Sequence, residues 1–366
     1  MMIRFSWAIM LCSLTLVSCF KQSEIIAPKP DSEQAFINNN LGLSSVELLG
    51  KNIFFDKSLS SPEGQSCGSC HSPARAFSDP LGRIISPGAV RGLFGTRNSP
   101  MVSYNAFSPQ RYYDNTDQTY VGGFFWDGRA NTLEEQAEKP FFNHVEMNNA
   151  DIAELVEKIK AGAYAELFTN IYGQDALDDN TVAFNYALQS IAEFEKSRQV
   201  NPFSSKYDRS LRGEVKLNDM ELKGLELFNG KAMCGNCHPT SVVQGYKEVL
   251  FTDFTYDNIG LPQVNAANPI DLGLGAIVNN ANENGKFKVP SLRNVAISAP
   301  YFHNGFAKNL DEVMVFYNER DKPGKFPSPE VSSTMNTDEL GDLKLSPAEI
   351  KAVIAFLQTL TDGYGY

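Results

Sequence analysis

Two short motifs hold most of the side chains in this chain that could bind a soft metal or a cofactor. The sequence has 366 residues, with six Cys and only four His, and both motifs read C-x-x-C-H. Their members are Cys67, Cys70 and His71 in the first motif and Cys234, Cys237 and His238 in the second. Two thiols at this spacing form thioethers with the vinyl groups of haem c, and the adjacent His ligates the iron. The motifs therefore predict two covalently bound haem c groups.

Two other uses of a C-x-x-C pair explain the motifs less well. A disulfide would give the adjacent His71 and His238 no role. A zinc site needs four ligands, normally from two such pairs, and requires no His directly after each pair. The repeated C-x-x-C-H pattern therefore favours haem c over both.

The ligand on the far side of each iron decides what the protein can do. A sixth protein ligand on both irons would make an electron carrier, whereas an open iron binds peroxide or another small molecule. Outside the motifs the chain has only His144 and His303, so the candidates for this ligand are these two, a Met or a Tyr.

Composition narrows the class of protein. Hydrophobic residues make up 42% of the chain and charged residues 20%, which is ordinary for a globular protein and excludes collagen-like, coiled-coil and wholly disordered chains. The formal net charge is −11 and there is no Lys/Arg block, which argues against nucleic acid as the main partner. The length suggests roughly two domains of ordinary size.

The N-terminus reads as an export signal. Arg4 precedes an apolar run, Trp7 to Val17, that is too short for a good membrane span. The run ends in Leu-Val-Ser-Cys, which resembles the lipobox of bacterial lipoproteins. Residues 1–18 are therefore expected to be a signal peptide, Cys19 to carry lipid and residues 19–40 to form a tether, although an ordinary signal peptide with an incidental Cys19 is the alternative. We expect a periplasmic protein that touches a membrane only through this lipid.

Helix signals outnumber strand signals along the rest of the chain. Four segments have helical periodicity or caps: 151–160, 181–198, 218–228 and the segment opened by the capping box Ser346–Glu349. The stretches 56–123 and 239–300 are rich in Gly, Pro, Asn and Ser and are expected to be long loops. Helices embedded in long ordered loops suit a mainly α fold whose core is completed by haem.

The two halves of the chain repeat the same landmarks in the same order. The first half has Gly50-x-x-x-Phe54, Cys67–His71, Phe77-x-Asp79, Arg97-Asn98 and Phe125-Trp126-Asp127-Gly128. The second half has Gly224-x-x-x-Phe228, Cys234–His238, Phe251-x-Asp253, Arg293-Asn294 and Phe302-His303-Asn304-Gly305. The repeat predicts two related c-type cytochrome domains with pseudo-twofold symmetry, 41–200 and 201–366, each holding one haem.

Four strings resemble the bacterial dihaem cytochrome c peroxidases and their relative MauG. They are GKNIFFDKSLSSPEGQSCGSCHSPARAFSDP, RNSPMV, FFWDGRANTLEEQAEKPFFNHVEM and FKVPSLRNVAISAPYFHNG, and the match runs from Gly50 to Tyr317. The resemblance implies that Trp126 lies between the two haems and that Gln136 and Glu146 face the peroxide pocket of the N-terminal haem. It also implies a calcium ion held by Asn98 and by the backbone carbonyls of Ser298 and Pro300.

One departure from the peroxidase pattern concerns the N-terminal iron. Ordinary members of the family carry a His shortly before the Arg-Asn-Ser-Pro element, and this His blocks the iron until the other haem is reduced. The present chain reads Ser86-Pro87-Gly88 there, with no His between His71 and His144. Proline cannot ligate iron, so we expect the N-terminal haem to be open without prior reduction.

A second departure concerns the C-terminal iron. Peroxidases place its Met ligand fourteen residues after the His of the Phe-His-Asn-Gly element, where this chain has Tyr317, as MauG-like proteins do. A phenolate would lower the reduction potential of the haem. Met314 on the same predicted helix is an alternative ligand, and Tyr317 as a core aromatic is another interpretation. The same count from Trp126 reaches Pro140, which offers no ligand.

Glu146 and Trp126 each have a structural interpretation beside the functional one. Cleavage of the peroxide O–O bond requires moving a proton from the near to the far oxygen, and a positioned carboxylate does this. Glu146 could instead cap the helix that follows, and Trp126 could be a core aromatic rather than an electron relay. His144 receives no role.

These residues favour a periplasmic dihaem peroxidase. It would reduce hydrogen peroxide at the open N-terminal haem with electrons that a small c-type cytochrome delivers through the C-terminal haem. The alternative is a MauG-like oxidase, in which both haems share two oxidising equivalents and oxidise residues of a partner protein. A plain electron carrier is disfavoured by Pro87 and Pro140. Family members are often dimers, and a homodimer is an assembly that the resemblance allows.

Overall fold

The computed structural model describes residues 30–243, 245–266 and 268–363. The predicted signal peptide and Cys19 lie outside these residues. No helix of the described part is long and apolar enough to cross a membrane.

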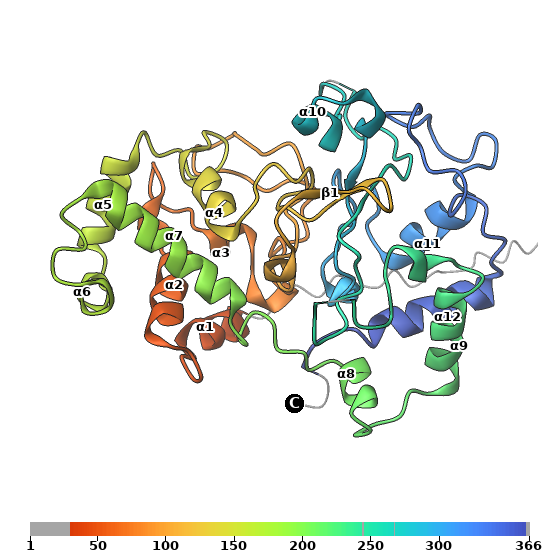
Figure 1. Cartoon of the computed structure of the whole chain (residues 1–366), viewed down its shortest axis with the longest axis horizontal. Helices are drawn as coiled ribbons and strands as arrows, with labels where there is room; N and C mark the ends of the chain where they lie inside the picture. Colours follow the sequence, from red (N-terminus) through yellow and green to blue (C-terminus); the bar gives the residue numbers. More distant parts are fainter. Residues whose placement is uncertain (1–29, 244, 267, 364–366) are drawn as a thin grey trace, which may run out of the picture.

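The described chain is mainly helical (Figure 1). Its helices are α1 (Pro30–Asn38), α2 (Ser45–Phe55), α3 (Cys67–Cys70), α4 (Leu133–Phe142), α5 (Ile152–Ala161), α6 (Ala165–Tyr172), α7 (Asn180–Lys196), α8 (Lys206–Leu211), α9 (Asp219–Asn229), α10 (Leu274–Val278), α11 (Leu310–Glu319) and α12 (Pro347–Gln358). The strands are β1 (Tyr112–Asp114), β2 (Thr119–Val121), β3 (Tyr256–Asp257) and β4 (Phe287–Lys288).

The four predicted helices are confirmed as α5, α7, α9 and α12, with ends within two residues of the prediction. The capping box of α12 is formed: Ser346 Oγ accepts from the Glu349 amide at 3.3 Å, and the Glu349 carboxylate accepts from the Ser346 amide at 2.8 Å. These helices were predictable because their caps and apolar faces are local in the sequence.

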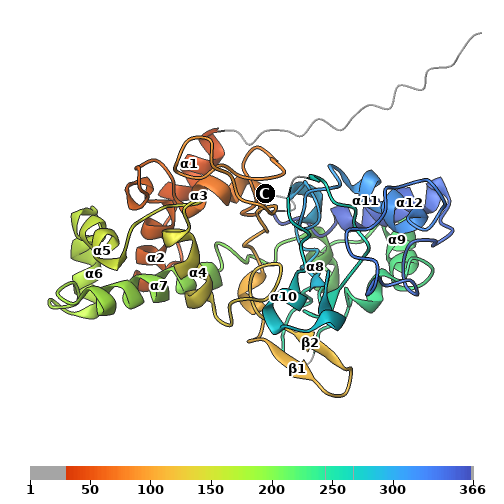
Figure 2. The same ribbon diagram turned by 90° about the horizontal axis from the view of Figure 1, so that it is seen from above.

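Two features differ from the expectation. Helix α1 lies within the stretch 19–40 that was expected to be a tether, and Phe36 packs its ring against Phe55 and Phe77. The pairs β1–β2 and β3–β4 lie inside the two stretches expected to be loops. Strands of two or three residues are too short for an alternating pattern to be recognised. Figure 2 shows the β1–β2 hairpin projecting where the two halves meet, and the Gly122 amide beside it donates to the Phe254 carbonyl at 2.9 Å.

Buried apolar residues form one large cluster in each half (Figures 1 and 2). The first surrounds the crossing of α2 with α7, and the second surrounds the crossing of α9 with α12. The division of the chain at residue 200 remains a prediction.

The same contacts occur at both crossings. A Cβ added to Gly50 would collide with the Ser190 carbonyl of α7, and one added to Gly224 would collide with the Ala352 carbonyl of α12. One turn further along each first helix, a buried Phe packs on a Phe of the second: the Phe54–Phe194 ring centroids are 5.4 Å apart and the Phe228–Phe356 centroids 5.2 Å apart. The glycines of the repeat therefore allow two backbones to touch.

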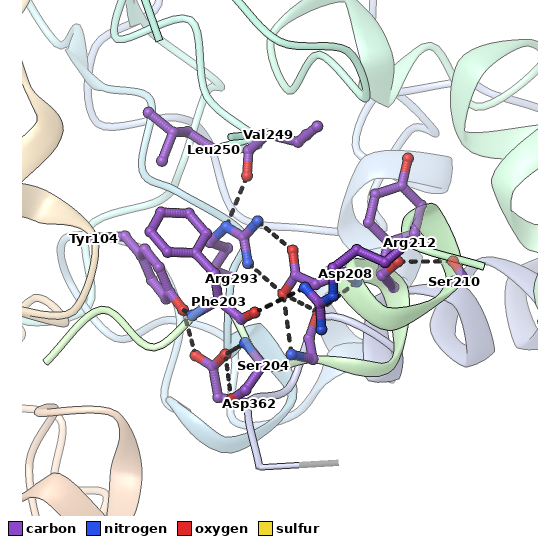
Figure 3. A network of polar contacts seen from close by, with 12 residues as sticks. Tyr104, Phe203, Ser204, Asp208, Ser210, Arg212, Val249, Leu250, Arg293 and Asp362 are labelled. Carbon is purple, nitrogen blue, oxygen red and sulfur yellow. Dashed lines mark hydrogen bonds and ion pairs between the residues drawn. The ribbon is translucent and has the colours of Figure 1, made fainter. Parts of the chain in front are cut away.

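A buried polar network around Tyr104 and Arg293 connects the halves near the C-terminus (Figure 3). Arg293 has no exposed surface and donates two hydrogen bonds to the Asp208 carboxylate at 2.8 and 3.0 Å. Its guanidinium lies 4.4 Å from the ring centroid of Phe203. The Phe203 amide donates to the Tyr104 hydroxyl at 3.0 Å, and this hydroxyl donates to Asp362 at 2.6 Å. Residues from both halves therefore share one polar network.

We predict that Gly50→Ala destabilises the protein by about 3 kcal/mol, because the new methyl group forces the α2 and α7 backbones apart. The free energy of unfolding, measured by urea denaturation of the haem-loaded protein, tests this. Gly95→Ala is the matched control, since its Cβ would meet only the Arg97 carbonyl, at 3.9 Å. Equal stability of both variants would contradict the close crossing.

We predict that Asp208→Asn lowers the free energy of unfolding at pH 7 by about 3–5 kcal/mol, because it leaves the buried Arg293 charge uncompensated. Burial alone would raise the pKa of Asp208, but Arg293 lowers it below its usual range. The pair therefore stabilises above the ordinary pKa of an Asp, and its contribution is lost as the pH falls through the folded value. The gap between variant and native protein should narrow in acid. Glu226→Gln, in an exposed pair with Lys223, should cost less than about 0.5 kcal/mol.

Candidate functional site

Each C-x-x-C-H motif folds as a tight turn that ends at its His. Helix α3 carries the first motif, and a short 3₁₀ turn at Cys234–Asn236 carries the second. No disulfide joins the four motif cysteines, and burial raises the pKa of Cys70 to about 11 and that of Cys234 to about 12. Both sulfurs of each motif are therefore available to form the thioethers of haem c.

A hydrogen bond to a phenylalanine carbonyl orients each motif histidine, and the Pro100 carbonyl also accepts from His71. His71 Nδ1 lies 2.9 Å from the Phe77 carbonyl, and His238 Nδ1 lies 2.8 Å from the Phe251 carbonyl. A carbonyl only accepts, so Nδ1 carries the proton and Nε2 keeps a free lone pair. Burial lowers the pKa of His238 to about 4 and also lowers that of His71, which keeps both rings neutral. Both are therefore prepared for metal ligation through Nε2.

A cavity lies beside each motif. The N-terminal cavity, of about 650 Å³, is lined by Cys67, Cys70 and His71, and the C-terminal cavity, of about 250 Å³, is lined by Cys234, Cys237 and His238. Each cavity thus presents two thiols and a neutral imidazole to one enclosed space, which is the donor set that haem c requires.

The zinc interpretation finds little support in the described residues. The one group there with three potential ligand atoms within 4.8 Å of one another is Cys237, Asp257 and Glu339. It takes only one Cys from its motif and excludes His238, whereas a structural zinc site needs four ligands.

The predicted peroxide-pocket residues gather in the N-terminal cavity. Gln136 and Pro140 reach it from α4, and Glu146 reaches it from the loop that follows α4. Burial raises the pKa of Glu146, while Arg129 and a hydrogen bond from Asn143 oppose this rise. Pro87 also lines the cavity, and its carbonyl accepts from Gln65 Nε2 at 2.9 Å. Pro87 and Pro140, which offer no ligand to iron, therefore both line this cavity.

The remaining histidines lie in different surroundings. His144 is exposed. His303 is 5% exposed, lines both cavities and stacks on Phe287 with ring centroids 3.5 Å apart. Its Nε2 has no hydrogen-bond partner among the described residues, and burial lowers its pKa to about 3.

Both candidate ligands of the C-terminal iron line the C-terminal cavity. Tyr317 and Met314 are on α11, and burial raises the pKa of the Tyr317 phenol. Helices α4 and α11 each have ten residues and begin at Leu133 and Leu310, so Pro140 and Tyr317 are both the eighth residue of their helix. The choice between Tyr317 and Met314 stays a prediction.

Trp126 lines both cavities. Its indole Nε1 donates to the Asn98 carbonyl at 2.9 Å, and the Asn98 amide donates to the His303 carbonyl at 2.7 Å. Its own carbonyl accepts from the Lys288 amide at 2.8 Å. These bonds fix Trp126 where the two cavities approach each other.

The three predicted calcium-binding residues line the C-terminal cavity. Asn98 is 5% exposed, and its amide nitrogen donates to the Ile84 carbonyl at 3.2 Å, which leaves the side-chain oxygen for another partner. Ser298 and Pro300 line the same cavity. Oxygen donors of this kind suit calcium, and the calcium site stays a prediction.

Sequence reasoning missed two buried charged residues in these cavities. Glu195 of α7 lines the N-terminal cavity, and Lys288 of β4 lines the C-terminal cavity. Burial lowers the pKa of Lys288 to about 7, and its Nζ donates to Asn105 and Ser108. The available signal for Glu195 was its position four residues after Ile191, on the apolar face of α7.

Comparison with known proteins places these features in a family. Residues 44–216 match the family model described as di-haem cytochrome c peroxidase. The chain is 37% identical to the methylamine utilization protein MauG of Paracoccus denitrificans, over 87% of this chain and 89% of that protein. It is 30% identical to the cytochrome c551 peroxidase of Nitrosomonas europaea, over 98% of this chain and 92% of that protein.

Solved structures give the same result. The fold is similar to that of the dihaem peroxidase BthA from Burkholderia thailandensis, with a TM-score of 0.79 and 30% identity, covering 88% of this chain and 87% of that one. Both cavities, with their paired cysteines and neutral histidines, agree with this likeness. The chain therefore belongs to the di-haem cytochrome c peroxidase and MauG family and is an enzyme of that family, which implies two haems.

Proposed function

We propose that this protein reduces hydrogen peroxide in the N-terminal cavity, using electrons that a small c-type cytochrome delivers at the C-terminal cavity. One observation supports this most directly. The N-terminal cavity is lined by His71, Gln136 and Glu146, and also by Pro87 and Pro140, neither of which can ligate iron. Such a cavity leaves room for a substrate beside groups that move protons.

The motif residues would hold one haem in each cavity. Cys67 and Cys70 would form the thioethers in the N-terminal cavity and Cys234 and Cys237 those in the C-terminal cavity, with His71 and His238 as iron ligands. When bound, the haems would supply redox-active iron, which accepts and releases the electrons of the reaction. The hydrogen bonds to the Phe77 and Phe251 carbonyls keep each imidazole in the tautomer that can ligate.

Glu146 would handle protons in the N-terminal cavity. Reduction of one hydrogen peroxide to two water molecules breaks the O–O bond and consumes two electrons and two protons. A carboxyl whose pKa is raised toward the working pH can take a proton from one oxygen and give it to the other. Gln136, from the same cavity, would orient the peroxide through its amide.

The cavity linings support the remaining assignments. Tyr317 would be the sixth ligand at the C-terminal iron, and Trp126 would carry electrons between the cavities that it joins. Asn98, with the Ser298 and Pro300 carbonyls, would hold calcium. We further propose two related haem domains meeting near residue 200, periplasmic location with a lipid at Cys19, and a homodimer.

A MauG-like activity is the second candidate, and Tyr317 favours it. A phenol occupies the position on α11 where peroxidases use Met, and Trp126 lines both cavities, which suits sharing of oxidising equivalents between two haems. In this case the electrons would come from residues of a partner protein rather than from a cytochrome.

Peroxide-dependent oxidation of a reduced c-type cytochrome separates the two activities. We expect turnover above a blank lacking the protein, and we expect the fully oxidised protein to react with peroxide without prior reduction. Glu146→Gln should lower kcat by about 100-fold or more. Glu138→Gln, on a side chain 40% exposed in the same region, should leave it unchanged. Absence of cytochrome oxidation together with a peroxide-induced spectral change would favour the MauG-like activity.

We predict that Tyr317→Phe changes the absorption spectrum of the low-spin haem and raises its midpoint potential, because an anionic donor is lost. Met314→Leu should leave both unchanged. The opposite pattern would assign Met314 as the ligand, and no change in either variant would exclude both residues.

A further inference from the structure

Glu195 is a buried carboxyl that nothing so far described uses. It lies in the last turn of α7, is 5% exposed and lines the N-terminal cavity with Gln136 and Glu146. Within the described residues, its carboxyl forms no hydrogen bond and no ion pair. Burial of a carboxyl without a partner is costly, so packing alone does not explain a Glu here.

The repeat shows what packing alone would select at this position. The Gly50–Ser190 and Gly224–Ala352 contacts, and the Phe194 and Phe356 rings, align α7 with α12. This alignment pairs Glu195 with Leu357, which is 5% exposed and lines the C-terminal cavity. A leucine therefore fills the equivalent place in the C-terminal half, whereas the carboxyl occurs in the cavity that Gln136 and Glu146 also line.

The surroundings of Glu195 favour its protonated form. Burial is the main cause that raises its pKa to about 8, and Glu134 from α4 adds to it, while Lys196 opposes it. Cys67 of α3 also faces it, but as a thioether this sulfur would not titrate. The other acids that line the cavity are Asp127, Glu146, Asp271 and Glu330. Burial therefore favours the protonated Glu195 carboxyl at neutral pH, in the cavity where the proposed reaction consumes protons.

We propose that Glu195 is a second proton-carrying carboxyl of the N-terminal cavity, which supplies one of the protons consumed when peroxide becomes water. Glu146 moves a proton between the two oxygens, whereas Glu195 provides one from outside the substrate and regains it from solvent. For each peroxide, the O–O bond breaks, two electrons come from the cytochrome donor, and two protons enter to form two water molecules. This role rests on the peroxidase activity proposed above.

Infrared difference spectroscopy of the haem-loaded protein tests the protonation state directly. Subtracting Glu195→Gln from native protein at pH 7 should reveal the carbonyl band of a protonated carboxylic acid, which disappears as the pH rises above about 8. The matched control is Glu193→Gln on the same helix, whose side chain is 42% exposed and paired with Lys196. Its difference spectrum should lack such a band. Absence of the band for Glu195 would overturn the proposal.

Kinetics with peroxide and a reduced c-type cytochrome tests the role in turnover. Glu195→Gln and the repeat-derived Glu195→Leu should lower kcat by about 100-fold with little change in KM for peroxide, and both should lose the fall in kcat above about pH 8. Glu195→Asp should retain most of the activity, which separates loss of the acid from loss of packing.

The outcomes distinguish this proposal from the activity on which it rests. If the native protein oxidises the cytochrome and Glu195→Gln does so equally well at every pH, only the role of Glu195 is wrong. If the native protein shows no turnover with peroxide, the peroxidase activity is wrong and the role of Glu195 with it. The infrared band then still reports whether the carboxyl is protonated.

Discussion

The hydrogen bond between each motif histidine and a phenylalanine carbonyl is the constraint around which both cavities are built. The accepting residues, Phe77 and Phe251, have φ values of 60° and 53°, an unusual backbone conformation for a residue with a large side chain. Such a conformation costs about 1–3 kcal/mol and persists only where the surroundings enforce it. Burial of both phenyl rings offsets this cost, since Phe77 is 3% and Phe251 1% exposed. The apolar core thereby fixes the tautomer on which metal ligation depends.

The two halves share this histidine hydrogen bond and the same helix crossing, and they differ in the side chains beside their cavities. Close helix crossings at Gly50 and Gly224 set equivalent helices beside each cavity. At matching positions the N-terminal half has Pro140 and Glu195, and the C-terminal half has Tyr317 and Leu357. Pro140 offers no ligand and Glu195 is an acid, whereas Tyr317 is the proposed ligand and Leu357 gives an apolar surface. This difference is consistent with the proposal that peroxide is reduced in the N-terminal cavity and that electrons enter at the C-terminal cavity.

The contact between the halves links the two sites. Trp126 and His303 occupy equivalent places in the repeat and line both cavities, and the backbone of Asn98 bonds to each of them. On another side Tyr104 of the N-terminal half bonds to Asp362, and its ring faces the guanidinium of the buried Arg293, 4.8 Å away (Figure 3). Because a hydrogen bond to a carboxylate is strong and directional, the Tyr104–Asp362 bond favours one relative placement of the halves.

The sequence by itself determined the chemistry and much of the framework. The two C-x-x-C-H motifs, the capped helices and the repeat can be recognised in the sequence. The fourteen-residue spacing that pairs Pro140 with Tyr317 agrees with the structure, where each is the eighth residue of a ten-residue helix. Only the tertiary structure decided that Trp126 lies at both cavities, that α1 and the short strands are folded, and that Glu195 and Lys288 are buried in cavity walls. The physical reason is that burial and cavity lining arise from segments far apart in the chain. A single Glu on an amphipathic helix looks the same in sequence whether solvent or a closed cavity surrounds it.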